Sequence, residues 1–184
     1  MKKQGKVTFL DKDEFDLSLE LAPRGVLELV IRREDGVLLL HREDPPYQGT
    51  WHFPGGFMAK GETLAACLSR LLKKELGIDM DAEVIGFRKL DYYSRPDTDP
   101  RGHLMHHTIE VFLTESQIEG IQRGKFFYSI PPDIMPHHGR FFRDVMRDEW
   151  RRSEQALLDM ALANVEPPRF EWVAALFDPG PGPY

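Results

Sequence analysis

The sequence predicts an α/β domain in which helices and a sheet form layers. The first observation is a pair of apolar runs, at residues 26–32 and 37–42, separated by the turn residues Glu34-Asp35-Gly36. This arrangement is typical of two strands joined by a hairpin. The first run is apolar almost throughout, which indicates burial on both faces. The second observation is a leucine stripe of helical period between residues 62 and 76. Strands interrupted by a central helix favour a layered α/β fold.

The leucine stripe predicts the clearest helix of the chain, from Glu62 to Leu76. Its apolar positions share one helix face, and they are Leu64, Leu68, Leu71, Leu72 and Leu76. Gly77 follows as a C-cap. Before the helix, Trp51-His52-Phe53 predicts a short strand, which Pro54-Gly55-Gly56 is expected to break.

The rest of the chain predicts further strands and a late helix. Residues 84–90 and 107–113 are predicted strands. The segment Asp91–Asp99 between them is predicted to be a solvated loop, with a substrate-closing flap as the alternative. Residues 141–163 predict a helix that packs on the domain, with a face for a homodimer as the alternative, and residues 170–177 predict a short closing element. We therefore expect a single domain over residues 1–184, with its core at about 24–177 and a loose tail at 178–184.

Composition and charge restrict the classes of function. The chain has 184 residues and a formal net charge of −6. Because this charge repels a phosphate polymer, we expect no nucleic-acid partner, whereas a small anion needs only a local positive pocket. The one cysteine, Cys67, is interpreted as a core residue and excludes an intrachain disulfide. No run approaches the roughly 20 apolar residues of a membrane helix, so we expect no membrane partner and a cytoplasmic location.

Residues 56–78 carry a motif of fixed spacing. The motif positions are Gly56, Glu62, Arg70, Leu72, Glu75, Gly77 and Ile78. They are in register with the Nudix box, G-x5-E-x7-R-E-U-x-E-E-x-G-U with U aliphatic, and the preceding residues 51–56 resemble the usual entry into that box. The resemblance covers residues 26–113 well. It implies a Nudix-type α/β/α sandwich with a mixed sheet, here with an added C-terminal helix.

Two positions depart from the box, because Leu71 and Lys74 stand where the family has glutamates. In an α-helix residues 71, 74 and 75 share one face. Carboxylates there would hold hard divalent cations, which polarise a diphosphate and lower the pKa of bound water. Since only Glu75 remains, we expect one Mg²⁺ or Mn²⁺ ion, completed by the Gly55 carbonyl, another acid and water.

The pattern Arg70-Leu71-x-x-x-Glu75 resembles one branch of the family, the GDP-mannose mannosyl hydrolases. That branch keeps only the last glutamate, uses one magnesium ion and cleaves the sugar C–O bond. The resemblance implies that Arg42 binds the diphosphate and that Glu28 is a substrate-binding acid.

Other positions differ from that branch. Phe57 replaces a phosphate-contacting arginine. Alignment on Trp172 places Glu166 and Pro167 where the branch has a metal ligand and a catalytic histidine. Glu166 is therefore a predicted metal ligand, whereas Pro167 cannot act as a base.

Each of these residues also has a purely structural interpretation. Glu75 could be a solvated helix residue and Arg42 a surface charge. Arg70 could orient Glu62 or Glu75, or contact phosphate, and orientation is the favoured role. Glu28 lies in a very apolar strand, where a buried carboxylate needs a partner, or else it occupies an exposed edge.

Two histidine pairs, His106-His107 and His137-His138, suggest further sites. Adjacent residues of a strand point to opposite faces, so each pair offers at most one ligand to a metal site. His107 is expected to pack or hydrogen-bond. His137 and His138, in a proline-flanked segment, are candidates for the general base.

These observations predict a magnesium-dependent hydrolase of a nucleoside diphosphate linked to another group, such as a sugar. The alternatives are a pyrophosphohydrolase that uses acids outside the box, such as Glu166, and a non-catalytic Nudix-fold binding module.

Overall fold

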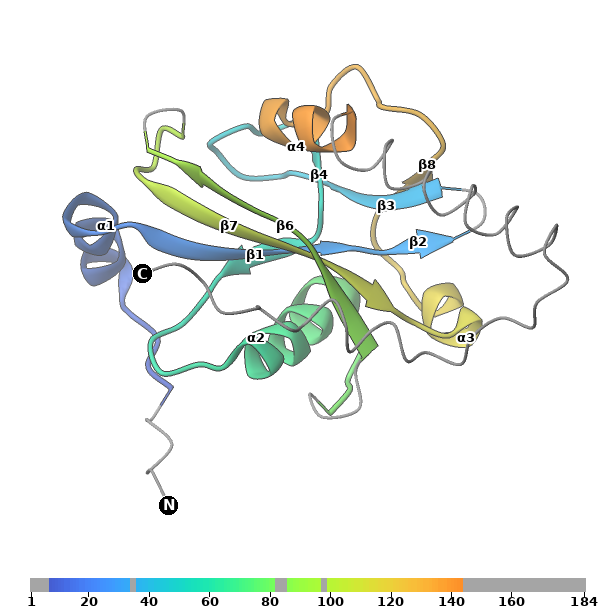
Figure 1. Cartoon of the computed structure of the whole chain (residues 1–184), viewed down its shortest axis with the longest axis horizontal. Coiled ribbons are helices and arrows are strands. Elements are labelled where there is room, and N and C mark those ends of the chain that lie inside the picture. The colour runs from blue at the N-terminus through green and yellow to red at the C-terminus, as the bar shows by residue number, and fades with distance from the viewer. Residues whose placement is uncertain (1–6, 34–35, 82–85, 97–98, 144–184) are drawn as a thin grey trace, which may run out of the picture. The chain divides into compact units, whose positions relative to one another are not determined.

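The computed structural model describes residues 7–33, 36–81, 86–96 and 99–143 (Figure 1). The chain divides into two compact units, residues 1–140 and 141–184, and the sheets and the site described below belong to the first. Most of the second unit lies outside the described residues, as do most of the helix predicted at 141–163 and the element predicted at 170–177. A single domain over residues 1–184 therefore stays a prediction.

A mixed four-stranded sheet forms the centre of the first unit. Its strands are β1 (Arg24–Val30), β5 (Gly55–Phe57), β6 (Gly86–Arg95) and β7 (Leu104–Phe112), in the order β5-β1-β7-β6. β1 and β7 are parallel, and the other pairs are antiparallel. The side chains of Val26–Val30 are all buried, as the apolar run predicted. The predicted mixed α/β sheet is confirmed.

A second sheet begins with the residues that follow β1 in the chain. It contains β2 (Arg32–Arg33), β3 (Gly36–His41), β4 (Trp51–His52) and β8 (Lys125–Phe127). The predicted hairpin agrees with the pairing of Arg33 with Gly36, although residues 34–35 themselves are outside the described ranges. Gly36 has φ 141°, and a Cβ there would lie 2.5 Å from the carbonyl oxygen of Phe127, so this turn requires glycine.

The short strand predicted at residues 51–53 is present as β4 and ends before Pro54, but a further strand follows that the sequence did not predict. Gly55–Phe57 forms β5 along the edge of β1, with Gly55 opposite Glu28. A Cβ on Gly55 would lie 2.5 Å from the carbonyl oxygen of Leu27. The absence of a side chain at Gly55 thus allows the backbone of β5 to pair closely with β1.

The predicted helix is present, but it is not α-helical throughout. Thr63 caps α2 (Leu64–Leu71), and a π-helical turn, η1 (Leu72–Leu76), follows it. Gly77 ends the helix with φ 75°, as the C-cap prediction required. Because a π turn fits more residues into each turn than an α-helix, the face shared by residues 71, 74 and 75 is not the one that α-helical spacing predicted.

The main core lies between the sheet and α2. Leu27, Leu29 and Ile31 alternate along the chain and belong to the same buried cluster as the helix residues Cys67, Leu68, Leu71 and Leu72. Cys67 is fully buried, and burial raises the pKa of its thiol to about 12, which confirms its core role. Because successive side chains of a strand point to opposite faces, Glu28 lies on the face of the sheet opposite to Leu27 and Leu29. That face meets α4 (Pro136–Phe141), so the sheet lies between α2 and α4 (Figure 1).

Two short helices were not predicted. They are α1 (Lys12–Leu21) and α3 (Glu115–Glu119), and each begins with a capping box. In α1, Asp11 accepts from the backbone N–H of Glu14, and the Glu14 side chain accepts in return. In α3, Thr114 and Gln117 repeat the arrangement. Both signals are visible in the sequence.

The predicted loop Asp91–Asp99 is partly a strand. β6 continues to Arg95, and Asp99 is buried with a bidentate ion pair to Arg101 at 2.8 and 2.9 Å. The solvated interpretation of this segment is therefore wrong at Asp99. Among the described residues, no helix has the length and apolar character needed to cross a membrane.

Leu71 provides a test of the core. Its side chain is fully buried, so Leu71→Ala should lower the free energy of unfolding by about 2–5 kcal/mol through lost contacts and a residual cavity. Urea denaturation measures the change. Leu21→Ala, at a position that is 74% exposed in α1, is the matched control and should change stability far less. Equal effects would show that Leu71 is not a core residue.

Candidate functional site

A cavity of about 460 Å³ gathers most of the residues that the sequence indicated. Its walls come from β1, β3, β5, the π turn and the segment around α4. The predicted site residues that line it are Glu28, Arg42, Gly55, Glu75, His137 and His138. Arg70 is not among its lining residues, and Glu166, with Pro167 and Trp172, lies outside the described residues.

Arg70 holds the loop before the helix in place. It donates to Glu62 at 2.7 and 2.9 Å and to the carbonyl oxygen of Phe57 at 2.9 Å. Burial alone would raise the pKa of Glu62, but the hydrogen bonds from Arg70 and Ala59 lower it. This geometry agrees with the orienting role favoured for Arg70.

The box helix presents one carboxylate to the cavity. Glu75 is mostly buried, and its Oε1 lies 3.2 Å from the exposed Nζ of Lys74. Leu71 fills the space beneath β5, since a Cβ on Gly56 would lie 3.0 Å from Leu71 Cδ2. A single carboxylate that is paired with an ammonium does not fit a cluster of divalent ions. It fits at most one ion, which would need substrate phosphates as further ligands.

Cationic side chains converge on the same cavity. Arg42 and Arg101 both line it, together with Lys74 and Arg123. Burial and the nearby charge of Arg101 lower the pKa of Arg42, and the carboxylates of Asp44, Asp99 and Glu75 partly offset this repulsion. Arg42 is anchored through Nε, which donates to the carbonyl oxygen of Pro46. An anion between these groups would relieve the repulsion.

Arg101 was missed by the sequence analysis. Its guanidinium lies 5.4 Å from the ring centroid of Phe57, the residue that replaces an expected arginine. Arg101 thus places beside Phe57 the positive charge that an arginine at position 57 would have supplied. The bidentate bond to buried Asp99 fixes Arg101, and this pairing across a short turn was the signal that could have indicated it.

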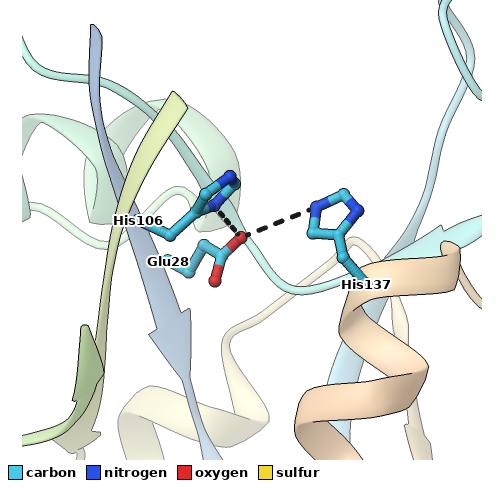
Figure 2. A group of neighbouring side chains, drawn as sticks. All are labelled: Glu28, His106 and His137. Carbon is cyan, nitrogen blue, oxygen red and sulfur yellow. Dashed lines mark hydrogen bonds and ion pairs between the residues drawn. The ribbon is translucent and has the colours of Figure 1, made fainter. Parts of the chain in front are cut away.

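Glu28 interacts with several side chains of the cavity, and Figure 2 shows its position beside His106 and His137. It is 3% exposed. Its Oε2 accepts from the hydroxyls of Tyr93 at 2.9 Å and Thr108 at 2.8 Å. Its Oε1 lies 2.7 Å from His106 Nδ1, 2.8 Å from His138 Nε2 and 3.9 Å from His137 Nε2. The interpretation of Glu28 as an exposed edge residue is wrong.

The hydrogen bonds of His138 fix its tautomer. Its Nδ1 accepts from the backbone N–H of Phe53 at 3.0 Å, so its proton is on Nε2 and is donated to Glu28. Neither nitrogen then has a lone pair to offer. This suits a positioning role better than that of a general base.

His106 and His137 keep nitrogens without partners. Within the described part of the chain, His106 Nε2 and His137 Nδ1 are buried and have no hydrogen-bond partner. Burial lowers the pKa of His137 to about 2, so its ring is neutral at physiological pH. A base of this pKa is poorly matched to neutral pH, whereas a neutral imidazole can bind a metal ion.

The electrostatics of Glu28 depend on these neighbours. Burial alone would raise its pKa, but the interactions with His138 and His106 outweigh burial and hold the pKa well below its ordinary value. Glu28 is therefore ionised in the folded protein. His107, the other member of its pair, faces the opposite side of β7 and packs against Tyr92, with ring centroids 4.8 Å apart.

Comparison with known proteins agrees with the motif. The NUDIX domain family matches residues 22–171. The ADP-ribose pyrophosphatase of Methanocaldococcus jannaschii is 27% identical over 150 residues, which are 79% of this chain and 86% of that protein. The low-salt glycan biosynthesis protein Agl8 of Haloferax volcanii is 34% identical over 114 residues, 61% of this chain and 73% of that protein.

Solved structures support the fold. The crystal structure of Shewanella oneidensis NrtR superposes with a TM-score of 0.50 at 18% identity, over 64% of this chain and 59% of that one. The chain thus spans little more than half the length of this structural relative, and the similarity concerns the fold alone.

The lowered pKa of Glu28 predicts a pH-dependent contribution to stability. Because the folded pKa lies below the unfolded value, Glu28 adds stability above about pH 4.3, the ordinary glutamate pKa, and this stability is lost as pH falls towards the folded value. The stability difference between wild type and Glu28→Gln should therefore shrink as pH falls through that window.

Urea denaturation at several pH values measures this difference. Glu20→Gln, at an exposed position of α1, is the control and should give a small difference at each pH. A wild-type advantage over Glu28→Gln that stays constant or grows on acidification would contradict the assignment of an ionised, buried Glu28.

Proposed function

The chain belongs to the Nudix family of hydrolases, and we propose that it hydrolyses a nucleoside diphosphate bonded to a further group such as a sugar. The observation that carries the proposal is the convergence of Arg42 and Arg101 beside Glu75 in one cavity. Two guanidinium groups match the charge of a diphosphate. The cavity volume is within the range of about 300–1,000 Å³ that is usual for small-molecule sites.

The relatives support this class of substrate. ADP-ribose is a nucleoside diphosphate bonded to a sugar, and the relative named as its pyrophosphatase aligns with most of the chain. The relative named for glycan biosynthesis is in keeping with a sugar-linked substrate. We propose a small-molecule partner, a cytoplasmic location and no nucleic-acid substrate, since the net charge of −6 opposes binding of a long polyanion.

The metal in this proposal is one Mg²⁺ or Mn²⁺ ion. Glu75, with the Gly55 carbonyl oxygen, would hold it together with the substrate phosphates, and Glu166 stays a predicted further ligand. When bound, such an ion neutralises charge on the diphosphate. Arg42 and Arg101 would bind the same phosphates from the cavity wall, and Arg70 would keep the loop in position.

The single carboxylate of the box also bears on which bond breaks. Attack on phosphorus in this family gathers several cations around the diphosphate. One ion with two arginines is better suited to stabilising a departing diphosphate while water attacks the sugar carbon. We therefore propose C–O cleavage, with P–O cleavage, the reaction named for the archaeal relative, as the alternative outcome.

The reaction is tested with ADP-ribose and a GDP-hexose in oxygen-18 water containing Mg²⁺. Label in the free sugar, with a nucleoside diphosphate as the other product, is the expected result. If the products are a nucleoside monophosphate and a sugar phosphate, the enzyme cleaves the P–O bond and the proposed C–O cleavage is wrong. Binding without any product would favour the non-catalytic module and overturn the proposed hydrolysis.

A variant arm tests the role of the arginines. Arg42→Met should lower kcat/KM by about 10- to 100-fold, because it removes a charged hydrogen-bond donor to the phosphates. Lys125→Met is the matched control, since Lys125 is exposed on β8, the strand paired with β3. Unchanged kcat/KM in Arg42→Met would exclude Arg42 from the diphosphate site.

The metal proposal predicts the effect of restoring a box glutamate. Lys74→Glu removes the ammonium beside Glu75 and adds an oxygen ligand, so it should tighten Mg²⁺ binding. Lys74 is 71% exposed, so solvent screening limits the gain to roughly tenfold. Calorimetric titration with Mg²⁺ measures the affinity. Lys73→Glu, at an exposed neighbour that pairs with Asp79, is the control, and equal gains in both variants would contradict a site at Glu75.

A further inference from the structure

We propose that Glu28, His106 and His137 form a binding site for one divalent transition-metal ion, distinct from the carboxylate of the box helix. The three side chains come from β1, β7 and the start of α4 and point toward one another (Figure 2). The proposal does not rest on the proposed hydrolysis, because it concerns only what these three residues bind.

The spacing of the donor atoms is close to that of ligands on one ion. One ligand atom from each residue lies within 4.8 Å of the other two. From Glu28 Oε1 the distances are 2.7 Å to His106 Nδ1 and 3.9 Å to His137 Nε2. With metal–ligand bonds of about 2.0–2.1 Å, two ligands of one ion are at most about 4.2 Å apart. In a tetrahedral site the ligand atoms are about 3.4 Å apart, so side-chain shifts of about 0.5–1.5 Å would bring all three atoms onto one ion.

The hydrogen bonding is incomplete at the histidines of this group. The side chains of His106 and His137 are only 1% and 7% exposed. Each keeps one buried nitrogen that has no hydrogen-bond partner within the described residues. These nitrogens, His106 Nε2 and His137 Nδ1, are not the ones nearest Glu28 Oε1. In a metal complex they would carry the ring protons, and His106 Nδ1 and His137 Nε2 would present their lone pairs to the ion.

The neighbours of Glu28 support it as a ligand without competing for the ion. Tyr93 and Thr108 occupy Oε2, which leaves Oε1 to face the histidines. His138 donates its Nε2 proton to Oε1, and the Phe53 N–H occupies its other nitrogen. A group with both nitrogens engaged orients a ligand rather than binding the metal itself.

The donor set selects the class of metal. Two imidazoles and one carboxylate suit Zn²⁺, Fe²⁺, Co²⁺ or Ni²⁺, whereas Mg²⁺ prefers six oxygen ligands. Three protein ligands also leave at least one coordination position open. Since all three residues line the 460 Å³ cavity, that position is accessible to a small molecule there.

Co²⁺ binding to the full chain, freed of metal with a chelator, tests the site. We expect one Co²⁺ per chain, with visible d–d absorption and displacement by Zn²⁺ but not by excess Mg²⁺. His106→Ala and His137→Ala should each weaken binding by at least about 100-fold. His138→Ala should weaken it by about 10- to 100-fold, as the loss of a group that orients a ligand does.

Two variants serve as controls. His107→Ala changes the neighbouring residue on the opposite face of β7, and Glu20→Gln changes an exposed carboxylate of α1. Both should bind Co²⁺ as the wild type does. Equal losses in His106→Ala and His107→Ala, or loss in Glu75→Gln with binding retained in His106→Ala, would overturn the proposal.

A measurement on the wild type covers the case in which a variant fails to fold. X-ray absorption of the zinc-loaded chain should show only nitrogen and oxygen neighbours at about 2.0–2.1 Å, with outer-shell scattering from two imidazoles. Scattering from one or no imidazole, or the absence of stoichiometric zinc, would show that the cluster is only a hydrogen-bonding group that fixes α4 against β1.

Discussion

The ionised carboxylate of Glu28 imposes the strongest constraint on this structure. It lies among the buried apolar residues 26–30 of β1, and it would be highly unfavourable there without partners. Its partners are supplied by β6 through Tyr93, by β7 through Thr108 and His106, and by α4 through His138. The pairing of β1 with β7 and the position of α4 therefore both depend on one side chain. Because a buried charge that loses a partner is strongly destabilising, these elements must form together.

The box helix shows a different balance between stability and metal binding. Leu71 adds to the core at a position where the box has a glutamate. The remaining acid, Glu75, lies in the π turn, a feature that often occurs at functional sites. The positive charge that is missing at Phe57 is supplied from elsewhere, since Arg101 lies beside that residue.

The sequence predicted the elements whose signals are local and periodic. The apolar runs of β1 and β3, the leucine face of α2 and the stop at Gly77 are all present. The π turn was not predicted, because hydrophobic spacing alone does not distinguish one wider turn from a regular helix. β5 was not predicted because glycine normally weakens strands, and here its lack of a Cβ is what permits the pairing.

The site could be predicted only in part. Glu75 and Gly55 were found through the motif and its entry, and Arg42 through the resemblance to the mannosyl hydrolase branch. The grouping of Glu28 with His106 and His137 depends on contacts between residues 78 and more positions apart in the chain. No periodic pattern reports such contacts. The parallel pairing of β1 with β7 brings Glu28 opposite Thr108. No local pattern in the sequence predicts that these two strands pair.

The repulsion between Arg42 and Arg101 has a consequence for anyone handling the protein. Two half-buried guanidinium groups that line one cavity attract small anions from the solution around them. Inorganic phosphate or sulfate in a buffer would occupy the same place as the phosphates of a nucleotide, and a nucleotide would then have to displace them. Affinities and melting temperatures measured in phosphate would differ from those measured in a buffer with a bulky, weakly bound anion. The choice of buffer salt is thus part of the chemistry of this cavity.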